Sequence, residues 1–394
     1  MPPTDLADPG ADAPVPPTAP TTGADLPVPE GSGVVEDAAA AVSSDERRRG
    51  RSPGGPVTLS QVAREAGVSL ATASRAINGS ANRTVRADLR ERVLAAAERL
   101  RYSPDANAQA MARGRTTSLG LILHDIADPY FSSIAAGVGL AAERADLALT
   151  LASTQHDPTR EPRFVDVLTR QRARAIIVAG GRRDDDETND AMRTALANFR
   201  HSGGSVALIG QPLLDVDTVV IANHSGAAAL ARALHAHGYR RFGVLGGPTD
   251  HLTARDRLTG FREALEELGC PLAEEAVASC AFTRDGGYDG MTRLLRDGPP
   301  VDVVFAVNDV MAVGAMAAAR DLGVRVPRDV GVAGFDDIVT LRDITPALTT
   351  VRVPLVDVGI AATELALAAP ATEPRLVHVE GTVVLRESTP PRRP

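Results

Sequence analysis

Aromatic side chains are rare in this sequence, and three of them follow predicted strands. Phe, Tyr and Trp make up 3% of the 394 residues, and Trp is absent. Tyr130 and Phe131 come after one short apolar run, and Phe282 comes after a later one. Any one of these rings is best explained by core packing, but three rings near strand ends indicate stacking on a bound ligand.

Polar side chains that can bind hydroxyl groups occupy similar positions. Asn308 and Asp336 each end a predicted strand, and Arg257 is predicted to begin a helix after a Gly-Gly-Pro turn. His251 and Thr253 come just before Arg257. Arginine and aspartate can each make two hydrogen bonds to one partner, which is the chemistry that holds the hydroxyl groups of a sugar.

The sequence contains no arrangement typical of catalysis or metal binding. It has no nucleophile–base pair, no paired-carboxylate site and no Cys-x-x-Cys spacing. Its two cysteines, Cys270 and Cys280, are predicted to be buried thiols in a reducing compartment. No apolar run is long enough to span a bilayer, and no secretion signal is recognised. We therefore expect a cytoplasmic protein that has neither cofactor nor metal and is not an enzyme.

Residues 58–78 have the pattern of two helices joined by a tight turn. Ala63 is small where the helices would cross, and Gly67 permits a left-handed turn conformation. Val68 can fill the corner, and Ser69 can cap the second helix. The pattern predicts a helix-turn-helix whose second helix enters the major groove of DNA, with a purely structural hairpin as the alternative.

Charge is distributed unevenly along the chain, whose net charge is −8. Residues 1–56 hold nine acids and four Arg, whereas residues 57–115 hold ten Arg and five acids. A short basic segment in an acidic chain indicates a polyanion-binding module. A solvated helix could carry the same charge, so the turn pattern is what favours DNA binding.

Composition and periodicity divide the chain into four parts. Residues 1–56 are rich in Pro, Ala, Asp, Gly, Ser and Thr and are predicted to be disordered. A helical headpiece at 57–104 and a short helix with linker at 105–116 follow. Residues 117–390 alternate apolar strands with amphipathic helices, which predicts parallel sheets with crossover helices. The predicted headpiece helices cover 59–66, 70–77 and 87–100; the later helices include 226–237, 258–268 and 310–322; the strands cover 119–123, 175–178, 206–209, 218–221, 242–245, 301–307 and 330–333.

From residue 57 to about 390 the sequence resembles the LacI/GalR (lactose-repressor) family. The motifs that carry the resemblance are Val57–Asn78, Tyr102–Pro104, Asp128–Phe131, Asn308–Ala312, Gly334–Asp337 and Thr345–Thr350. The resemblance implies an all-α headpiece, a hinge helix and an α/β sensor of two parallel-sheet subdomains similar to periplasmic binding proteins. It also implies a homodimeric transcriptional regulator, more a repressor than an activator, that binds palindromic double-stranded operator DNA under the control of a small-molecule effector.

By this resemblance, the N-subdomain comprises about 117–238 and 354–375, and the C-subdomain about 239–350 and 377–390. The effector would bind in the cleft between them, and we expect water to satisfy the buried charged groups there when the cleft is empty. Ala222-Asn223 replaces the family's usual Asp-Asn, so a sugar is expected first, with a sugar derivative or nucleoside left open. The implied effector residues are Tyr130, Phe131, His251, Thr253, Arg257, Phe282, Asn308 and Asp336.

The resemblance also implies DNA contacts in the headpiece and hinge. Leu70 and Ala71 would make apolar contacts to bases, and Arg75 would reach a guanine edge. Met111 would wedge into the central minor-groove step, unless its segment is an ordinary linker. Arg86 stands where the family often has a helix-capping serine. The other implied contacts are Thr58, Leu59, Ser69, Thr72, Ser74, Asn78 and Tyr102.

Two further classes share this architecture: a transport-type sugar-binding protein and an α/β enzyme acting on sugars. The helix-turn-helix and the missing secretion signal oppose the first class, and the missing catalytic residues oppose the second. The sequence leaves open whether the effector releases or recruits DNA binding. It also leaves open the operator sequence and the choice between dimer and tetramer.

Overall fold

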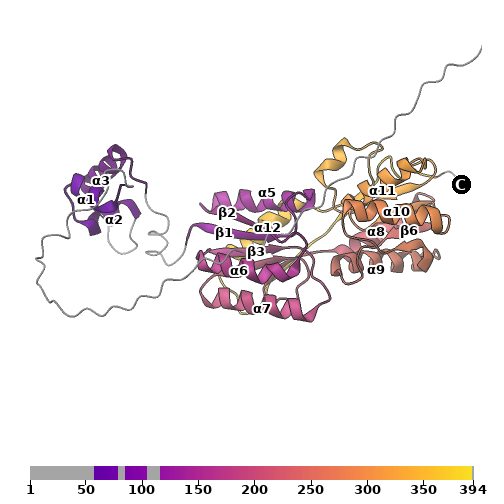
Figure 1. Ribbon diagram of the computed structural model, residues 1–394, viewed down its shortest axis with the longest axis horizontal. Helices are drawn as coiled ribbons and strands as arrows, with labels where there is room; N and C mark the ends of the chain where they lie inside the picture. Colours follow the sequence, from indigo (N-terminus) through magenta and orange to yellow (C-terminus); the bar gives the residue numbers. More distant parts are fainter. Residues whose placement is uncertain (1–56, 79–84, 104–115, 393–394) are drawn as a thin grey trace, which may run out of the picture. The chain divides into compact units, whose positions relative to one another are not determined.

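The computed structural model describes residues 57–78, 85–103 and 116–392. The predicted disordered tail and nearly all of the predicted hinge, including Met111, lie outside these ranges. Within them, the headpiece consists of α1 (Leu59–Glu65), α2 (Leu70–Asn78) and α3 (Ala87–Arg99) (Figure 1). Each helix contributes small or branched apolar side chains to one core, formed by Val62, Ala63, Ala66, Ala73, Ala76, Val93 and Ala96.

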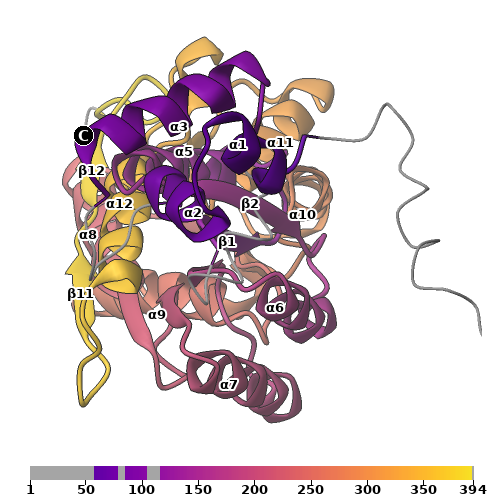
Figure 2. The same cartoon turned by 90° about the vertical axis from the view of Figure 1, so that its left-hand side faces the viewer.

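The N-subdomain is built on a six-stranded parallel sheet in the order β11-β5-β4-β3-β1-β2. Helices α5 (Pro129–Arg144) and α12 (Leu355–Leu367) pack together on one face of the sheet. Helices α6 (Glu161–Arg170) and α7 (Asp186–His201) pack together on the other face (Figure 2). The strands are β1 (Ser118–Leu123), β2 (Ala148–Ser153), β3 (Ala175–Ala179), β4 (Ser205–Ile209), β5 (Asp217–Ile221) and β11 (Leu376–Val379).

The C-subdomain is built on a four-stranded parallel sheet in the order β7-β6-β8-β9. Its strands are β6 (Phe242–Leu245), β7 (Val277–Ala278), β8 (Val303–Ala306) and β9 (Gly331–Ala333). Its helices pack in two pairs, α8 (Asn223–Ala236) with α9 (Leu252–Glu267), and α10 (Arg284–Asp297) with α11 (Asp309–Asp321). The remaining elements are η2 (Pro158–Arg160), η3 (Glu274–Ala276), η4 (Val339–Asp343) and the antiparallel pair β10 (Thr350–Arg352) and β12 (Thr382–Val384).

The two parallel sheets confirm the predicted fold class, but the subdomain boundaries differ from the expected ones. Helix α8 packs on α9 and so belongs with the C-subdomain, although it was assigned to the N-subdomain. Strand β11 pairs with β5 and extends the N-subdomain sheet to residue 379, beyond the expected end at 375. The chain therefore crosses between the subdomains near residues 222, 353 and 380. These positions depend on tertiary pairing, which the local sequence pattern does not specify.

Several local expectations also need correction. Helix α9 begins at Leu252 rather than Leu258, so Thr253 and Arg257 lie inside the helix. Strands β2, β7, β10, β11 and β12 were not predicted, because they are short or half-exposed and lack a continuous apolar run. Both cysteines are free but only half-buried.

Candidate functional site

A cavity lies between the two subdomains, beyond the carboxyl ends of their parallel strands. In the N-subdomain sheet, β2 lies on one side of β1, whereas β3, β4 and β5 follow on the other side. The direction in which strands are added therefore changes between β1 and β3, and α/β sheets bind ligands at such switch points. All eight residues predicted to bind the effector line this cavity: Tyr130, Phe131, His251, Thr253, Arg257, Phe282, Asn308 and Asp336. The lining also includes His124, Asp128, His156, Gly181, Val310 and Ile338, which the sequence did not suggest.

Arg257 is held by protein groups on every side. Its Nη2 donates to Asp336 Oδ1 at 2.7 Å, its Nη1 to the Val307 carbonyl at 2.7 Å, and its Nε to Asn223 Oδ1 at 2.8 Å. The guanidinium also lies 3.8 Å from the centre of the Phe335 ring. Both members of the ion pair are buried. The expectation that water satisfies this pair was therefore wrong, because two side chains and a backbone carbonyl from three segments already bond to Arg257.

Asp336 occupies a backbone conformation that side-chain-bearing residues rarely adopt, with φ of 118°. Its N–H donates to the Val351 carbonyl at 2.8 Å, and its carbonyl accepts from Val353 N–H at 3.2 Å. A strained backbone conformation of this kind persists only where surrounding contacts hold it in place, and such conformations are common at functional sites. Burial raises the pKa of Asp336 to about 6, while Arg257 opposes the rise. The buried Asp309 lies nearby, and burial raises its pKa as well.

Aromatic rings cover the cavity from both subdomains. In the N-subdomain, the ring centres of Tyr130 and Phe131 lie 4.9 Å apart, and His124 lies 5.2 Å from Phe131. In the C-subdomain, His251 stacks on Phe282 at 4.5 Å with an interplanar angle of 18°. The cavity thus joins apolar ring faces to the polar end formed by the Arg257–Asp336 pair, an arrangement suited to a sugar ring with hydroxyls at one edge.

Burial favours the neutral form of two imidazoles in the cavity, His156 and His251. Desolvation lowers the pKa of His251 to about 3, and it also lowers the pKa of His156. His251 Nδ1 is buried and has no hydrogen-bond partner among the described residues. His124 Nε2 lies 3.7 Å from Glu161 Oε1, and Glu161 pairs in turn with the buried Arg182 at 2.5 Å.

Two remaining polar residues at the cavity act through the backbone. Asn308 caps α11, since its Oδ1 accepts from Met311 N–H at 2.8 Å. Asp128 caps α5 by accepting from Tyr130 N–H at 2.9 Å, and burial raises the pKa of Asp128.

Asn223 was noted in the sequence only as part of an unusual Ala-Asn pair. Its bond to Arg257 shows that this asparagine supports the site, a role that only the three-dimensional contacts reveal.

The headpiece has the predicted turn geometry. Gly67 has φ of 62°, the left-handed conformation expected for the turn residue. Ser69 Oγ accepts from Thr72 N–H at 3.1 Å and so caps α2. At the amino end of α2, Leu70 is 52% exposed and Ala71 is also exposed. This exposure leaves both side chains free to contact another molecule.

Other predicted DNA-contacting residues have structural partners within the headpiece. Arg75 Nε donates to the Ala71 carbonyl at 2.9 Å, so the side chain lies along α2. Thr58 caps α1, and Asn78 Nδ2 donates to Ser74 Oγ at 3.3 Å. Leu59 and Tyr102 pack against the headpiece core. Arg86 precedes α3 without a side-chain capping bond, as its replacement of serine suggested.

The described ranges contain neither a helix that could cross a membrane nor a candidate metal cluster. None of the helices there has the length and apolar character needed to cross a membrane. Nor does any group of three or more His, Cys, Asp or Glu side chains in those ranges form a possible metal site.

Comparison with known proteins finds family matches for the headpiece and for part of the sensor region. Residues 58–105 match the model described as "Bacterial regulatory proteins, lacI family", and residues 231–389 match "Periplasmic binding protein-like domain". The HTH-type transcriptional regulator GalS of Salmonella typhimurium is 35% identical over 315 residues, which cover 79% of this chain and 89% of that protein. The HTH-type transcriptional repressor PurR of Proteus mirabilis is 33% identical over 299 residues, covering 75% and 85%.

Solved structures give the same result. The lac repressor dimer bound to operator and the anti-inducer ONPF matches with a TM-score of 0.73 at 26% identity, covering 85% of this chain and 99% of that one. The transcriptional regulator CelR in complex with cellobiose matches with a TM-score of 0.62 at 31% identity, covering 84% and 99%. The chain therefore belongs to the lacI family of bacterial regulatory proteins, and it is a DNA-binding transcriptional regulator rather than an enzyme.

Proposed function

We propose that this protein is a repressor whose operator affinity is set by an uncharged sugar or sugar derivative bound between the sensor subdomains. The observation that carries the proposal is the cavity in which the Arg257–Asp336 pair faces rings from both subdomains. Arginine and carboxylate groups bind vicinal hydroxyls, and ring faces cover the apolar side of a sugar. A nucleoside combines the same two features and is the second candidate.

The name of one structural relative supports a carbohydrate effector, because CelR was solved in complex with cellobiose. The lac repressor was solved with the anti-inducer ONPF, so it too holds a small molecule. In this chain we assign effector contact to all eight predicted lining residues, and we add His124 and His156 from the structure. The stacked His251 and Phe282 would cover one ring face, with His251 Nδ1 free to bond a ligand hydroxyl.

For operator recognition we assign base contacts to Leu70, Ala71 and Arg75. An arginine matches the O6 and N7 atoms of guanine, whereas Leu70 and Ala71 offer only apolar contact, as to a thymine methyl. Met111 would insert at the operator centre from the hinge. The positions left for phosphate or further base contacts are Thr58, Leu59, Ser69, Thr72, Ser74, Asn78 and Tyr102.

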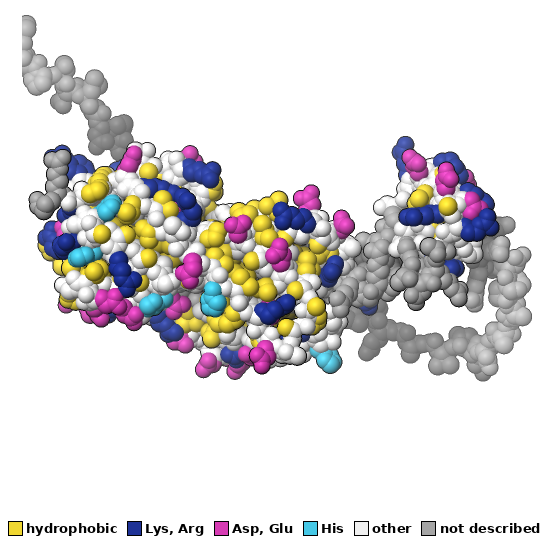
Figure 3. Space-filling view, turned by 180° about the vertical axis from the view of Figure 1, so that it is seen from behind, with side chains coloured by type: hydrophobic (Ala, Val, Ile, Leu, Met, Phe, Trp, Pro, Cys, Tyr) yellow, Lys and Arg dark blue, Asp and Glu magenta, His cyan; other side chains and the backbone are white. Residues whose placement is uncertain are grey.

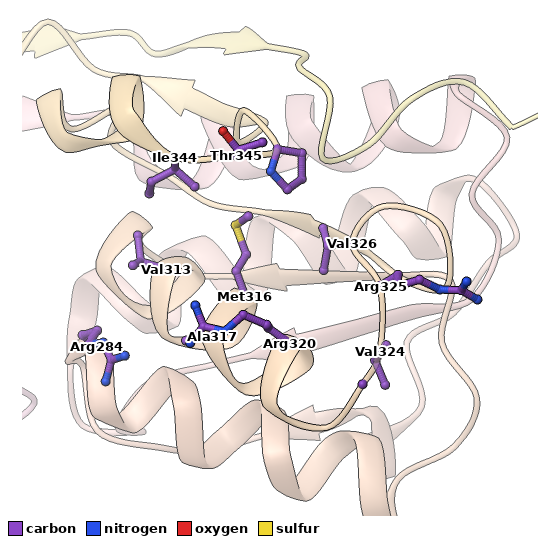
Figure 4. A pocket seen from close by; sticks show the side chains of 12 residues that line it. Arg284, Val313, Met316, Ala317, Arg320, Val324, Arg325, Val326, Ile344 and Thr345 are labelled. Atoms are coloured by element: carbon purple, nitrogen blue, oxygen red, sulfur yellow. The ribbon is translucent and has the colours of Figure 1, made fainter.

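We further propose that the protein acts in the cytoplasm as a homodimer. Leu140 on α5 and Leu151 on β2 are 46% and 47% exposed, and apolar side chains gather on the visible face of the N-subdomain (Figure 3). On the C-subdomain, Val313 and Met316 of α11 line a groove with Ile344, and arginines flank it (Figure 4). Exposed apolar surface of this kind is typical of subunit interfaces. A palindromic operator would match the two-fold symmetry of such a dimer.

A mobility-shift assay tests this function against its alternatives. The full chain should bind the upstream region of its own operon at nanomolar concentration, and Arg75→Ala should weaken that binding specifically. A transport-type binding protein or an α/β enzyme would not shift the fragment. Failure to bind any fragment of that region would contradict the proposed operator.

A further inference from the structure

Direct contacts between the subdomains close one edge of the effector cleft. This edge, here called the lip, consists of the loop after β3 (181–184) and the segment that begins α9 (250–256), which lie against each other. Leu252 N–H donates to the Arg182 carbonyl at 3.0 Å, and Asp184 N–H donates to the Asp250 carbonyl at 2.8 Å. The two segments thus form a short antiparallel bridge at Arg183 and His251.

The bridge brings two chain segments unusually close together. A Cβ placed on Gly181 would lie 2.3 Å from Thr253 Oγ1 and 2.8 Å from His251 Cε1. Thr253 and His251 line the cavity, as does Gly181 itself. Any side chain at position 181 would therefore hold the lip apart, and glycine permits it to close.

Two ion pairs cross the same lip with opposite polarity. Arg183 Nη1 from the N-subdomain lies 2.8 Å from Asp250 Oδ2, and Arg255 Nη1 from the C-subdomain lies 2.6 Å from Asp184 Oδ2. Adjacent residues of the loop therefore carry charges that complement the facing segment. All four side chains are 35–64% exposed, so added salt screens these pairs.

Gln211, which follows β4, connects the lip to the effector cavity. Its Oε1 accepts from Arg182 N–H at 2.8 Å, and its Nε2 donates to Thr253 Oγ1 at 3.0 Å. The same Nε2 lies 3.4 Å from Asp256 Oδ2. One amide thereby fixes the N-subdomain loop and a cavity-lining hydroxyl of the C-subdomain at once.

We propose that Gln211 and the two crossed ion pairs form a latch that stabilises the closed form of the effector cleft, with Gln211 as the residue that positions Thr253; this inference rests on the proposed effector site. With the latch formed, the cavity has about 30 Å³ of free volume, far less than ligand pockets normally provide. An effector therefore enters only after the latch opens. The latch sets the balance between open and closed clefts and hence the effector concentration to which the regulator responds.

Hydrogen–deuterium exchange of the full-length protein tests the latch without operator or effector. The Asp184 and Leu252 amides report it directly, because their hydrogen bonds exist only when the lip is closed. The test variants are Gln211→Ala and the double variant Arg183→Ala/Arg255→Ala. The matched control is Arg232→Ala, which removes an equally exposed ion pair at 2.7 Å between two helices of the C-subdomain.

Both test variants should speed exchange at these two amides by about two- to tenfold, the range expected for losing hydrogen bonds in Gln211→Ala and exposed ion pairs in the double variant. Amides of β3 and β8 should keep their wild-type rates, and Arg232→Ala should change neither set. In wild-type protein, 1 M salt should speed hydrogen exchange at the Asp184 and Leu252 amides. In the double variant, salt should leave the exchange rates of these amides unchanged.

Unchanged exchange at these amides in Gln211→Ala would overturn the proposal. So would equal acceleration of the β3 and β8 amides, because the contacts would then stabilise the fold and not the closed cleft. Neither result bears on operator binding, so failure of the latch is distinguishable from failure of the proposed function.

Discussion

Asp336 neutralises a buried arginine that has no access to bulk water. Replacing it with alanine leaves the Arg257 charge without a counter-ion. We expect Asp336→Ala to lower the free energy of unfolding by about 3–5 kcal/mol. Asp336→Asn should cost less, because an amide oxygen can still accept from Arg257. Urea unfolding of both variants checks this order, with Asp329→Asn as a control at an exposed pair. Equal stability of Asp336→Ala and wild type would show that the pair is not buried in solution.

Arg75 is half-buried along α2 in the free headpiece and must turn outward to reach a base. We expect Arg75→Ala to weaken operator binding by about 1–3 kcal/mol and to relax preference at one base pair of each half-site. Binding to non-specific DNA should change little, because phosphate contacts remain. Anisotropy titrations with the operator and single-base variants measure both effects. An equal loss of affinity for every DNA sequence tested would show that Arg75 contacts phosphates and not a base.

His251 makes the stability of the sensor domain depend on pH. Its pKa is lowered from 6.5 to about 3 by burial, so the unfolded chain binds a proton at a pH where the folded protein does not. Its contribution to stability is therefore complete above pH 6.5 and is lost as the pH falls toward 3. Between pH 7.5 and 5.5 the melting temperature should fall, and it should fall less in His251→Gln. If the melting temperatures of wild type and His251→Gln fell by the same amount over this pH range, His251 would not be the source of the pH dependence.

The site residues show how far sequence reasoning reaches at this scale. The eight residues named from strand ends, aromatic scarcity and family resemblance all line one cavity. His124, His156 and Asn223 were not assigned there. No local pattern marks them, because their relevance comes from packing between strands that are distant in sequence. Their neighbours in the fold, Glu161 and Arg257, could not be paired with them by spacing alone.

At the scale of elements, helices were easier to predict than strands. The headpiece helices agree closely with the expected ranges, because Gly67 and Ser69 carry local turn and capping signals. Edge strands β2 and β11 were missed, since their half-exposed faces lack the apolar run that marked β3. The start of α9 was misplaced because its first turns are polar and lack an apolar stripe.

The hinge gives a prediction about an element that forms on DNA. We expect residues 105–112 to fold on operator and Met111 to insert at its centre, because folding there is coupled to binding. Met111→Gly should lose most specific affinity and leave the oligomeric state unchanged. Amide exchange of this segment with and without operator tests the coupling. Equal protection in both states would exclude it.

At the scale of the whole molecule, the crossing points of the chain were the least predictable feature. The chain passes between the subdomains near residues 222, 353 and 380. These positions depend on the packing of α8 against α9 and on the pairing of β11 with β5. These same crossings connect the subdomains that enclose the effector cavity. A ligand that favours one arrangement of the subdomains can therefore change the spacing of two headpieces in a dimer, which is linkage between separate sites.

The central claim is that the cleft controls operator affinity. Its most direct test measures the operator Kd of the full-length protein against a panel of sugars and nucleosides, in wild type and in Asp336→Asn. At least one compound should change the wild-type Kd by about 5- to 150-fold, raising it if it is an inducer and lowering it if it is a corepressor. Asp336→Asn should bind operator as wild type does and lose that response, whereas Asp329→Asn should keep it. A full response by Asp336→Asn, or a wild-type Kd that no compound changes, would contradict the account.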